Sequence, residues 1–215
     1  MCMKNLLIPI IAQLQKKRPI FHSEADLQHA LAWELHKQHP DAEIRLEYPI
    51  NQARRTYLDM WIVFPDGQKL ALELKYKTRR IQLEADSEKF ILANHSAHDC
   101  GRYDALRDIQ RIEEIVQADK EVFGAVLFMT NDSAYWEPPR TLDTMDASFR
   151  IHDESTLSGT RQWAAHTGAG TMKGREAAIN IHGKYTVQWQ EYSSFERQTG
   201  SRFRFFLLPI NMTKK

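Results

Sequence analysis

Residues 56–64 (TYLDMWIVF), the PDG sequence at 65–67 and residues 69–77 (KLALELKYK) decide the fold predicted for this chain. The first stretch is rich in aromatic and β-branched residues, which favour strands, and PDG favours a tight turn. In the second stretch leucines alternate with other residues, so Glu73 and Lys75 share the face opposite the leucines. The sequence therefore predicts two antiparallel strands joined by a short turn.

A helix and another strand are predicted ahead of this pair. Ser23 offers a hydroxyl group at a helix N-cap, with an acidic residue three positions later. Apolar residues then recur at helical spacing until Pro40, which ends the helix. Residues 43–50 alternate as a strand. This strand is expected to present three apolar side chains on one face: Ile44, Leu46 and Tyr48.

A second helix and a buried strand are predicted after a polar, irregular connection at residues 78–102, in which some helix is expected. Three residues of this connection lack a fourth ligand at metal-binding spacing and are interpreted as polar loop residues: His95, His98 and Cys100. The helix runs from about Tyr103 to Ala118. Its solvated face is expected to carry four charged residues: Asp104, Arg107, Asp108 and Arg111. Residues 122–129 (VFGAVLFM) are continuously apolar, which is typical of a central strand that pairs in parallel with an earlier one.

The last third of the chain differs in composition. Residues 131–200 are rich in glycine, serine, threonine and aromatic residues, and are predicted to form an insertion or subdomain. Short strands are expected near 178–181 and 185–190, with the tryptophans in a small satellite core. Residues 203–210 (FRFFLLPI) return as a closing strand. The chain, residues 1–215, is thus predicted to be a single domain of the α/β (α+β) class, with a mixed central sheet flanked by helices.

Composition narrows the class of protein. The 215 residues are 42% hydrophobic and 27% charged, as in an ordinary globular protein. The net charge of +1 gives no overall basic field, although a basic patch balanced by acidic residues has the same sum. No run of 18 apolar residues occurs, so no membrane partner is predicted. Cys2 and Cys100 are too few for a disulfide framework and are interpreted as reduced thiols of a cytoplasmic protein.

Asp59, Glu73 and Lys75 are the residues that point most directly to chemistry. Asp59 lies within a predicted strand, where aspartate is depleted, and the neighbouring strand carries Glu73. Two carboxylates in a half-buried sheet repel each other unless a cation lies between them. Asp59, Glu73 and the Leu74 carbonyl are therefore predicted to bind Mg²⁺ or Mn²⁺. Lys75 would orient an attacking water, take its proton or stabilise the phosphate. Ion pairing without catalysis is the alternative.

Other charged residues lie near these strands. Glu24, at the start of the first helix, borders the surface that packs on the sheet. It is predicted either to ligate a second ion or a metal-bound water, or to interact favourably with the helix dipole. Basic residues at the ends of the two strands would bind phosphates, or would be solvated loop residues: Arg54, Arg55, Lys77, Arg79 and Arg80.

Three segments in this order resemble the PD-(D/E)XK, or restriction-endonuclease-like, nuclease superfamily: FHSEADLQ at 21–28, LDMWI at 58–62 and ALELKY at 71–76. The resemblance covers residues 21–130 and implies the core order α-β-β-β-α-β, with the acid-x-Lys motif on the third strand. The residue before Asp59 is Leu58 rather than the proline of the superfamily's motif, a departure that the superfamily commonly tolerates.

This resemblance implies a metal-dependent endonuclease that hydrolyses DNA, with a role in restriction or genome defence. It also implies that Asp59 and Glu73 bind the metal, that Lys75 is the catalytic lysine and that Glu24 is the acid of the first helix. Three alternatives stay open: an inactive module that binds nucleic acid or protein, an RNA nuclease, and a junction resolvase acting as a homodimer. One sequence does not select a recognition site, because base readout depends on which loops enter which groove.

Overall fold

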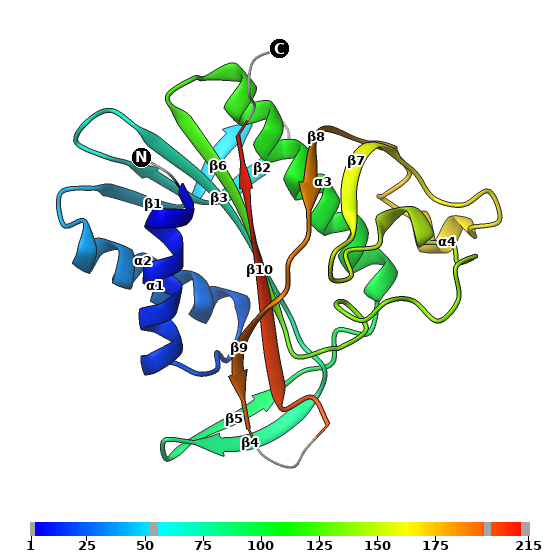
Figure 1. The fold of residues 1–215 in the computed structure, drawn as a ribbon, viewed down its shortest axis with the longest axis horizontal. Coiled ribbons are helices and arrows are strands. Elements are labelled where there is room, and N and C mark those ends of the chain that lie inside the picture. The colour runs from blue at the N-terminus through cyan, green and yellow to red at the C-terminus, as the bar shows by residue number, and fades with distance from the viewer. Residues whose placement is uncertain (1–2, 52–55, 196–198, 212–215) are drawn as a thin grey trace.

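The computed structural model describes residues 3–51, 56–195 and 199–211. Its central element is a six-stranded mixed sheet (Figure 1). In spatial order the strands are β1 (Glu43–Asn51), β2 (Thr56–Val63), β3 (Lys69–Lys77), β6 (Val122–Thr130), β10 (Arg202–Ile210) and β9 (Gln190–Ser194). β3 and β6 pair in parallel over their whole length, from Lys69↔Val122 to Lys77↔Thr130, and the other neighbours are antiparallel. The predicted parallel pairing of the apolar strand is confirmed, as is the closing strand.

Helices cover both faces of the sheet (Figure 1). α1 (Met3–Lys17) and α2 (Glu24–Gln38) lie on one face, and α3 (His98–Ala118) lies on the other. The residues of β3 alternate between two hydrophobic clusters, one on each face of the sheet. Leu70, Leu72 and Leu74 pack in the cluster with α1 and α2, whereas Ala71 packs in the cluster with α3. The predicted class, a mixed α/β fold with a central sheet flanked by helices, is therefore confirmed.

α2 begins and ends as predicted. The Ser23 hydroxyl accepts a hydrogen bond from the Asp26 amide at 3.1 Å, which satisfies one of the free donors of the first turn. Leu27, Leu31 and Leu35 are buried along one stripe, each contributing about 2 kcal/mol of hydrophobic stabilisation. The helix ends at Gln38, two residues before Pro40.

α1 was not predicted, because the sequence interpretation places its first element after Ser23. Its buried residues have helical spacing: Leu6, Leu7, Ile10, Ile11 and Leu14. Pro9 lies inside the helix on the exposed side, and a proline at such a position hides the pattern since it usually breaks a helix.

The connection at 78–102 contains more regular structure than predicted. β4 (Ile81–Ala85) and β5 (Glu88–Leu92) form a hairpin. Its two turn residues, Asp86 and Ser87, have φ of 50° and 65°, as a type I′ turn requires. α3 then begins at His98 rather than near Tyr103, so the prediction that His98 and Cys100 are loop residues is wrong.

Residues 131–200 are integrated with the core. β7 (Thr156–Arg161) pairs with β8 (Ile179–Thr186), near the short helices Ala147–Phe149 and α4 (Ala169–Met172). The two strands predicted near 178–181 and 185–190 are instead one strand, β8, followed by β9, which joins the central sheet. The tryptophans do not form a satellite core, because all three belong to the cluster between the sheet and α3: Trp136, Trp163 and Trp189. Trp189 contacts Phe128 and Phe206 of the sheet, and Trp163 contacts Tyr103 of α3.

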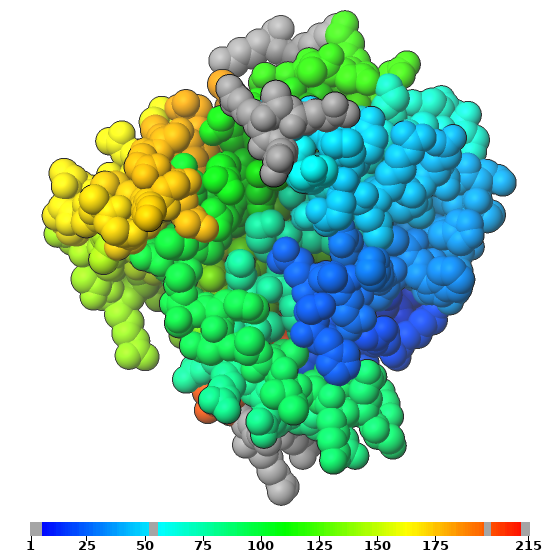
Figure 2. All heavy atoms as spheres, turned by 180° about the vertical axis from the view of Figure 1, so that it is seen from behind, coloured from blue at the N-terminus to red at the C-terminus, as the bar shows by residue number. Residues whose placement is uncertain are grey.

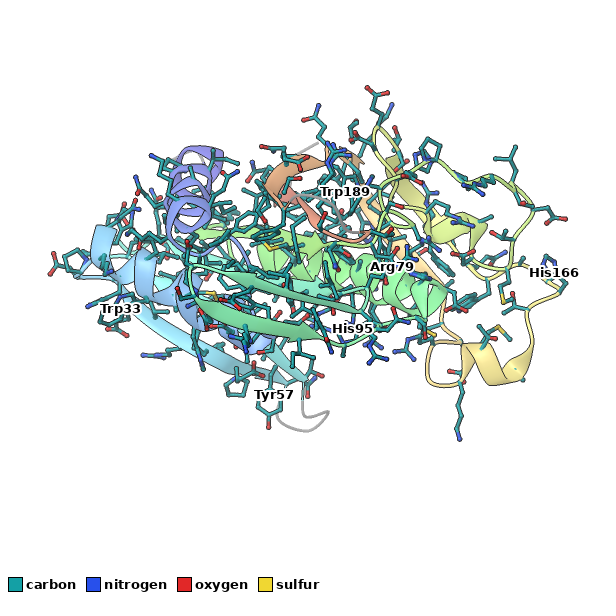
Figure 3. All side chains as sticks on the ribbon, turned by 90° about the horizontal axis from the view of Figure 1, so that it is seen from below. Trp33, Tyr57, Arg79, His95, His166 and Trp189 are labelled. Carbon is teal, nitrogen blue, oxygen red and sulfur yellow. The ribbon has the colours of Figure 1, made fainter. Side chains whose placement is uncertain are left out.

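Large apolar side chains are mostly buried. Trp33 and Tyr57 are exceptions, 62% and 47% exposed, and both lie at the outer surface in Figure 3. In the described part of the chain, no helix combines the length and the apolar character needed to cross a membrane.

Candidate active site

β2 and β3 separate at Asp59. Their paired residues run from Val63↔Lys69 to Met60↔Leu72. Beyond this point, the Asp59 carboxylate accepts a hydrogen bond from the Leu74 amide at 2.5 Å. A side-chain oxygen of Asp59 thus takes the place of a backbone acceptor for the Leu74 amide. The backbones of β2 and β3 are no longer paired beyond this point.

Both β1 and β2 change face at the same level. Leu46 and Met60 are paired and pack on the side of α1 and α2, whereas the next pair, Tyr48 and Leu58, packs on the side of α3. The residue between the two pairs in β1, Glu47, has a φ of 50°, a left-handed conformation that costs about 1–2 kcal/mol for a residue with a side chain. The prediction that Ile44, Leu46 and Tyr48 share a face is therefore wrong at its last residue.

Gln28 of α2 bridges the two strands at this irregularity. Its amide nitrogen donates to Glu47 Oε1 at 3.1 Å and to the Asp59 carbonyl at 2.7 Å. Gln28 is buried, so both hydrogen bonds are shielded from water. The contact fixes the backbone on either side of the point where Asp59 leaves the ladder.

Glu24 binds the same edge of β3. As the first residue of α2, it accepts a hydrogen bond from the Tyr76 amide at 2.7 Å. The amides of Leu74 and Tyr76, two residues apart, are thus both bonded by carboxylates, one from β2 and one from α2. Burial raises the pKa of Glu24, against the opposing effects of Lys75 and the Tyr76 amide. Glu24 therefore contacts the predicted site, although it also stands in the first turn of its helix.

Glu73 lies on the face of β3 opposite Leu72 and Leu74, against α3. It is 1% exposed and forms an ion pair with Arg111. Burial raises the pKa of Glu73 to about 9, with repulsion from Asp108 and Asp59 adding to the shift and Arg111 opposing it. The predicted facing of Glu73 is confirmed, and its partner is a residue that the sequence interpretation leaves in solvent.

Lys75 contacts both β3 and α3. Its ammonium nitrogen is 2.9 Å from the Leu74 carbonyl oxygen and 2.9 Å from Asp108 Oδ2. Burial lowers the pKa of Lys75, but attraction from Asp108, Glu24 and Asp59 outweighs it, so the pKa lies above its ordinary value. Lys75 is consequently a charged donor in this structure.

Asp108 and Arg111 are the residues that sequence reasoning missed. Asp108 is 2% exposed, and burial raises its pKa against the attraction of Lys75 and Arg111. Arg111 Nη2 lies 3.3 Å from Asp108 Oδ1. The prediction of a solvated face containing both is wrong. The available signal was the position of Asp108 next to Ile109, one turn from Ala105 and Ile112 of the buried stripe.

The site holds more carboxyl groups than cationic groups. Four carboxylates surround the two cations Lys75 and Arg111: Glu24, Asp59, Glu73 and Asp108. All the donors are oxygens, which hard divalent cations prefer. Within the ranges that the structure describes, no three His, Cys, Asp or Glu side chains are grouped so as to hold a metal ion. Two carboxylates and a carbonyl are nevertheless enough for Mg²⁺, which keeps several waters.

An open groove leads to this site. It has a volume of about 720 Å³ and lies between α3, the last residues of β1 and the first residues of β2. Arg107 and Arg111 line it on one side, and Asn51 and Thr56 on the other. In Figure 2 the green of α3 lies beside the cyan of β1 and β2. Solvent and a ligand can thus approach Arg111.

The basic residues predicted to bind nucleic acid are only partly described. Arg54 and Arg55, like Cys2, lie outside the described residues. Lys77 ends β3, and Arg79 and Arg80 follow it as exposed residues. The Asn131 side chain anchors this segment, accepting from the Arg79 amide at 2.8 Å and donating to its carbonyl at 3.1 Å. Arg79 therefore lies at the carboxyl ends of β3 and β6.

Comparison with known proteins adds no relative. No family model matches the chain, and searches of curated proteins and of solved structures find no match either.

Proposed function

We propose that this protein is a metal-dependent nuclease that hydrolyses phosphodiester bonds in DNA. The observation that carries the proposal is the pair of carboxylate contacts to β3: Asp59 bonds the Leu74 amide and Glu24 bonds the Tyr76 amide. These contacts surround the segment that carries Glu73 and Lys75. Acids from two strands and a helix, together with a lysine, suit the hydrolysis of a phosphodiester.

A restriction-endonuclease-like core is part of this proposal. The order α2, β1, β2, β3, α3, β6, with β3 parallel to β6, agrees with the order that the resemblance implies. The β4–β5 hairpin is an addition between β3 and α3.

Asp59, Glu73 and the Leu74 carbonyl would hold Mg²⁺ or Mn²⁺. The oxygen donors and the excess of carboxylates suit such an ion, which when bound polarises a phosphoryl oxygen and lowers the pKa of a water. Glu73 already pairs with Arg111. The Arg111 guanidinium therefore competes with the metal ion for the Glu73 carboxylate. Released from Glu73, Arg111 would face the open groove, where it could bind a phosphate of the substrate.

Lys75 would act as a fixed positive charge rather than as a base. Its raised pKa keeps the ammonium group protonated, and its hydrogen bond to Leu74 holds it beside the proposed reaction centre. It would therefore offset negative charge on the phosphate in the transition state. Glu24 would position β3 through the Tyr76 amide.

DNA would approach along the groove beside α3. Arg107 and Arg111 line the groove, and Lys77, Arg79 and Arg80 extend from the end of β3. Contacts of such residues to phosphates position a nucleic acid without reading its sequence. A role in restriction or genome defence, a cytoplasmic location and a homodimer rest on the resemblance and on composition alone.

The test is cleavage of plasmid DNA, single-stranded DNA and RNA with Mg²⁺ or Mn²⁺. Wild type should cleave DNA, Lys75→Ala and Asp59→Asn should lose cleavage, and Asp41→Asn, an exposed acid elsewhere, should retain it. Cleavage surviving in Lys75→Ala or Asp59→Asn would exclude this mechanism. Preferential cleavage of RNA or of four-way junctions would instead assign an RNA nuclease or a resolvase.

One observation favours a second candidate, a binding module without hydrolysis. Glu73 and Lys75 are already satisfied by Arg111 and Asp108 of α3, as expected if the acids only stabilise the fold. That candidate predicts DNA binding that is independent of divalent ions and unchanged by Glu73→Gln. The nuclease proposal predicts that this substitution strongly weakens binding of the cation.

A further inference from the structure

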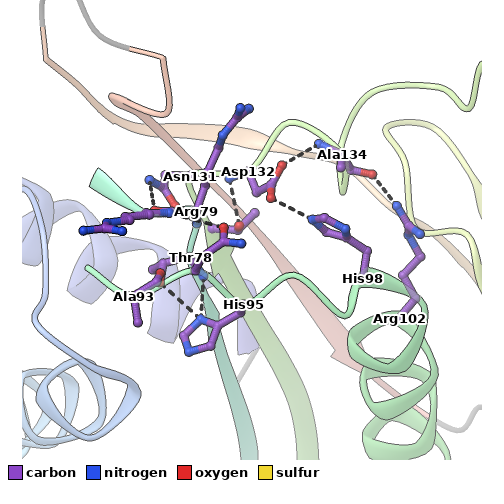
Figure 4. A network of polar contacts seen from close by, with 12 residues as sticks. Thr78, Arg79, Ala93, His95, His98, Arg102, Asn131, Asp132 and Ala134 are labelled. Carbon is purple, nitrogen blue, oxygen red and sulfur yellow. Dashed lines mark hydrogen bonds and ion pairs between the residues drawn. The ribbon is translucent and has the colours of Figure 1, made fainter. Parts of the chain in front are cut away.

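A second cavity, of about 500 Å³, lies at the carboxyl ends of β3 and β6, where α3 begins. Its lining includes four arginines and a histidine: Arg79, Arg102, Arg140, Arg150 and His98. Figure 4 shows how Arg79 follows β3, while His98 and Arg102 extend from the first turns of α3. None of the residues proposed for hydrolysis lines this cavity.

The positive charges of the cavity are only partly neutralised by protein groups. Arg102 and Arg150 share one carboxylate, that of Asp146, which forms an ion pair with Arg102 and lies 3.2 Å from Arg150. The lining also holds two acidic residues: Glu137 is exposed, and Asp132 accepts hydrogen bonds from His98 at 2.7 Å and from the Ala134 amide at 3.1 Å. The Asp132 carboxylate is therefore already engaged by donors other than the arginines.

Two arginine donors are buried without a protein acceptor. The Nε groups of Arg102 and Arg150 have no hydrogen-bond partner among the described residues. Arg102 is 5% exposed, and its other nitrogens are fixed by Asp146 and by the Ala134 carbonyl at 2.5 Å. Burial and the adjacent charge of Arg102 lower the pKa of Arg150. Both Nε atoms are also closed off from solvent, so an anion in the cavity would bond the exposed guanidinium groups of Arg79 and Arg140 and would balance the charge of the buried arginines.

We propose that this cavity binds a phosphate group. Several guanidinium groups around one polar cavity suit an anion with several oxygens, because each guanidinium presents its donors in a fixed planar fork. The volume exceeds what one phosphate fills, so the group is carried by a larger molecule or shares the cavity with water. Arg79 stands four residues after Lys75, about 13 Å along an extended chain. A nucleic acid strand or free phosphate could supply this chemistry, and neither source depends on hydrolysis at Glu73 and Lys75.

The test is calorimetric titration without divalent ions, so that it is independent of the proposed nuclease activity. Inorganic phosphate and a 5′-phosphorylated dinucleotide are the two probes, with sodium chloride at matched ionic strength as the blank. The double variant Arg79→Gln/Arg140→Gln changes two exposed residues of the cavity and leaves the buried Arg102 in place. It should weaken the binding of phosphate by about tenfold. Arg150→Lys, which retains the charge but loses the fork, should weaken it as well.

Arg45→Gln is the matched control, because Arg45 is an exposed arginine of β1 that pairs only with Glu43 among the described residues. It should leave the affinity for phosphate unchanged. Tighter binding of the dinucleotide than of phosphate would identify a nucleic acid strand as the source, and equal binding would identify free phosphate. Absence of phosphate binding by wild type, or equal affinity in the double variant, would overturn the proposal.

Discussion

Arg111 of α3 forms an ion pair with Glu73 of β3 and lies 3.3 Å from Asp108 as well. One guanidinium thus serves two carboxylates, each at most 2% exposed, at the centre of the candidate site. Removing either partner of such a buried pair leaves an uncompensated charge. Arg111 therefore occupies the position where the proposed function requires a divalent cation to neutralise Glu73.

Arg111→Gln should destabilise the protein when no divalent ion is present. Above about pH 9, where Glu73 is ionised, Glu73 and Asp108 would lose their shared counter-charge at a cost of about 2 kcal/mol, below the full value for a buried pair because the Arg111 side chain is 20% exposed. Mg²⁺ should restore much of this stability, and its affinity should rise, since the competing guanidinium is gone. Urea unfolding in EDTA and in Mg²⁺ measures both effects.

Arg107→Gln serves as the control for this experiment. Arg107 is on the same helix and lines the same groove, but its side chain is 46% exposed and pairs with Asp104 at 3.7 Å. Its replacement should change the free energy of unfolding by no more than about 0.5 kcal/mol. If Mg²⁺ stabilises wild type and Arg111→Gln equally, competition for Glu73 is excluded.

Binding of the cation should depend on pH through Glu73. Its pKa is raised to about 9, so the carboxyl group is protonated below that pH and a cation must displace the proton. The affinity for Mg²⁺ should therefore increase between about pH 6 and pH 9, by up to about tenfold per unit. Calorimetry across this range measures the slope. Glu73→Gln should bind weakly and without the slope, whereas a pH-independent affinity in wild type would contradict the role of Glu73.

The facing of Glu73 and Lys75 could be predicted because it depends on local alternation. Leu72 and Leu74 pack towards α1 and α2, which forces the residues between and after them to the side of α3. The position of Glu24 next to the sheet could likewise be predicted, because helical spacing places it beside the apolar stripe of α2. Each of these features is set by neighbours in the sequence.

Features set by distant residues escaped prediction. Arg111 and Asp108 are 38 and 33 positions from the residues that they contact in β3, and charged residues three apart on a helix are usually solvated. The change of face at Glu47 is supported by Gln28 from α2. Alternation assumes a regular strand, so it could not indicate where a tertiary contact interrupts one.

Asp59 should have separable structural and electrostatic roles. Asp59→Ala would leave the Leu74 amide without its acceptor, at a cost of about 2 kcal/mol. Asp59→Asn keeps an acceptor oxygen and should cost less than about 1 kcal/mol. Both should lose affinity for Mg²⁺, because the negative charge is gone. Chemical denaturation and calorimetry distinguish these effects, and full Mg²⁺ binding by Asp59→Asn would remove Asp59 from the proposed metal site.

Glu113 should stabilise the fold without contributing to the candidate site. It is fully buried on α3 and accepts hydrogen bonds from the His182 and Gly183 amides of β8, at 2.9 and 2.7 Å, and from the Tyr185 hydroxyl at 2.8 Å. Glu113→Ala would deprive these donors of their acceptor and should lower the free energy of unfolding by about 3 kcal/mol. Its folded form should keep the affinity for Mg²⁺, since effects at sites without shared partners are nearly independent.

Glu114→Ala is the neighbouring control for that substitution. Glu114 is exposed and bonds the Gln110 side chain at 2.9 Å, so its loss should cost no more than about 0.5 kcal/mol. Urea unfolding compares the two variants, and calorimetry with Mg²⁺ is carried out at a temperature where both are folded. A Glu113→Ala protein that folds but no longer binds Mg²⁺ would show that the contact between α3 and β8 holds Asp108 and Arg111 in place. In that case residues 131–200 would support the candidate site as well as the core.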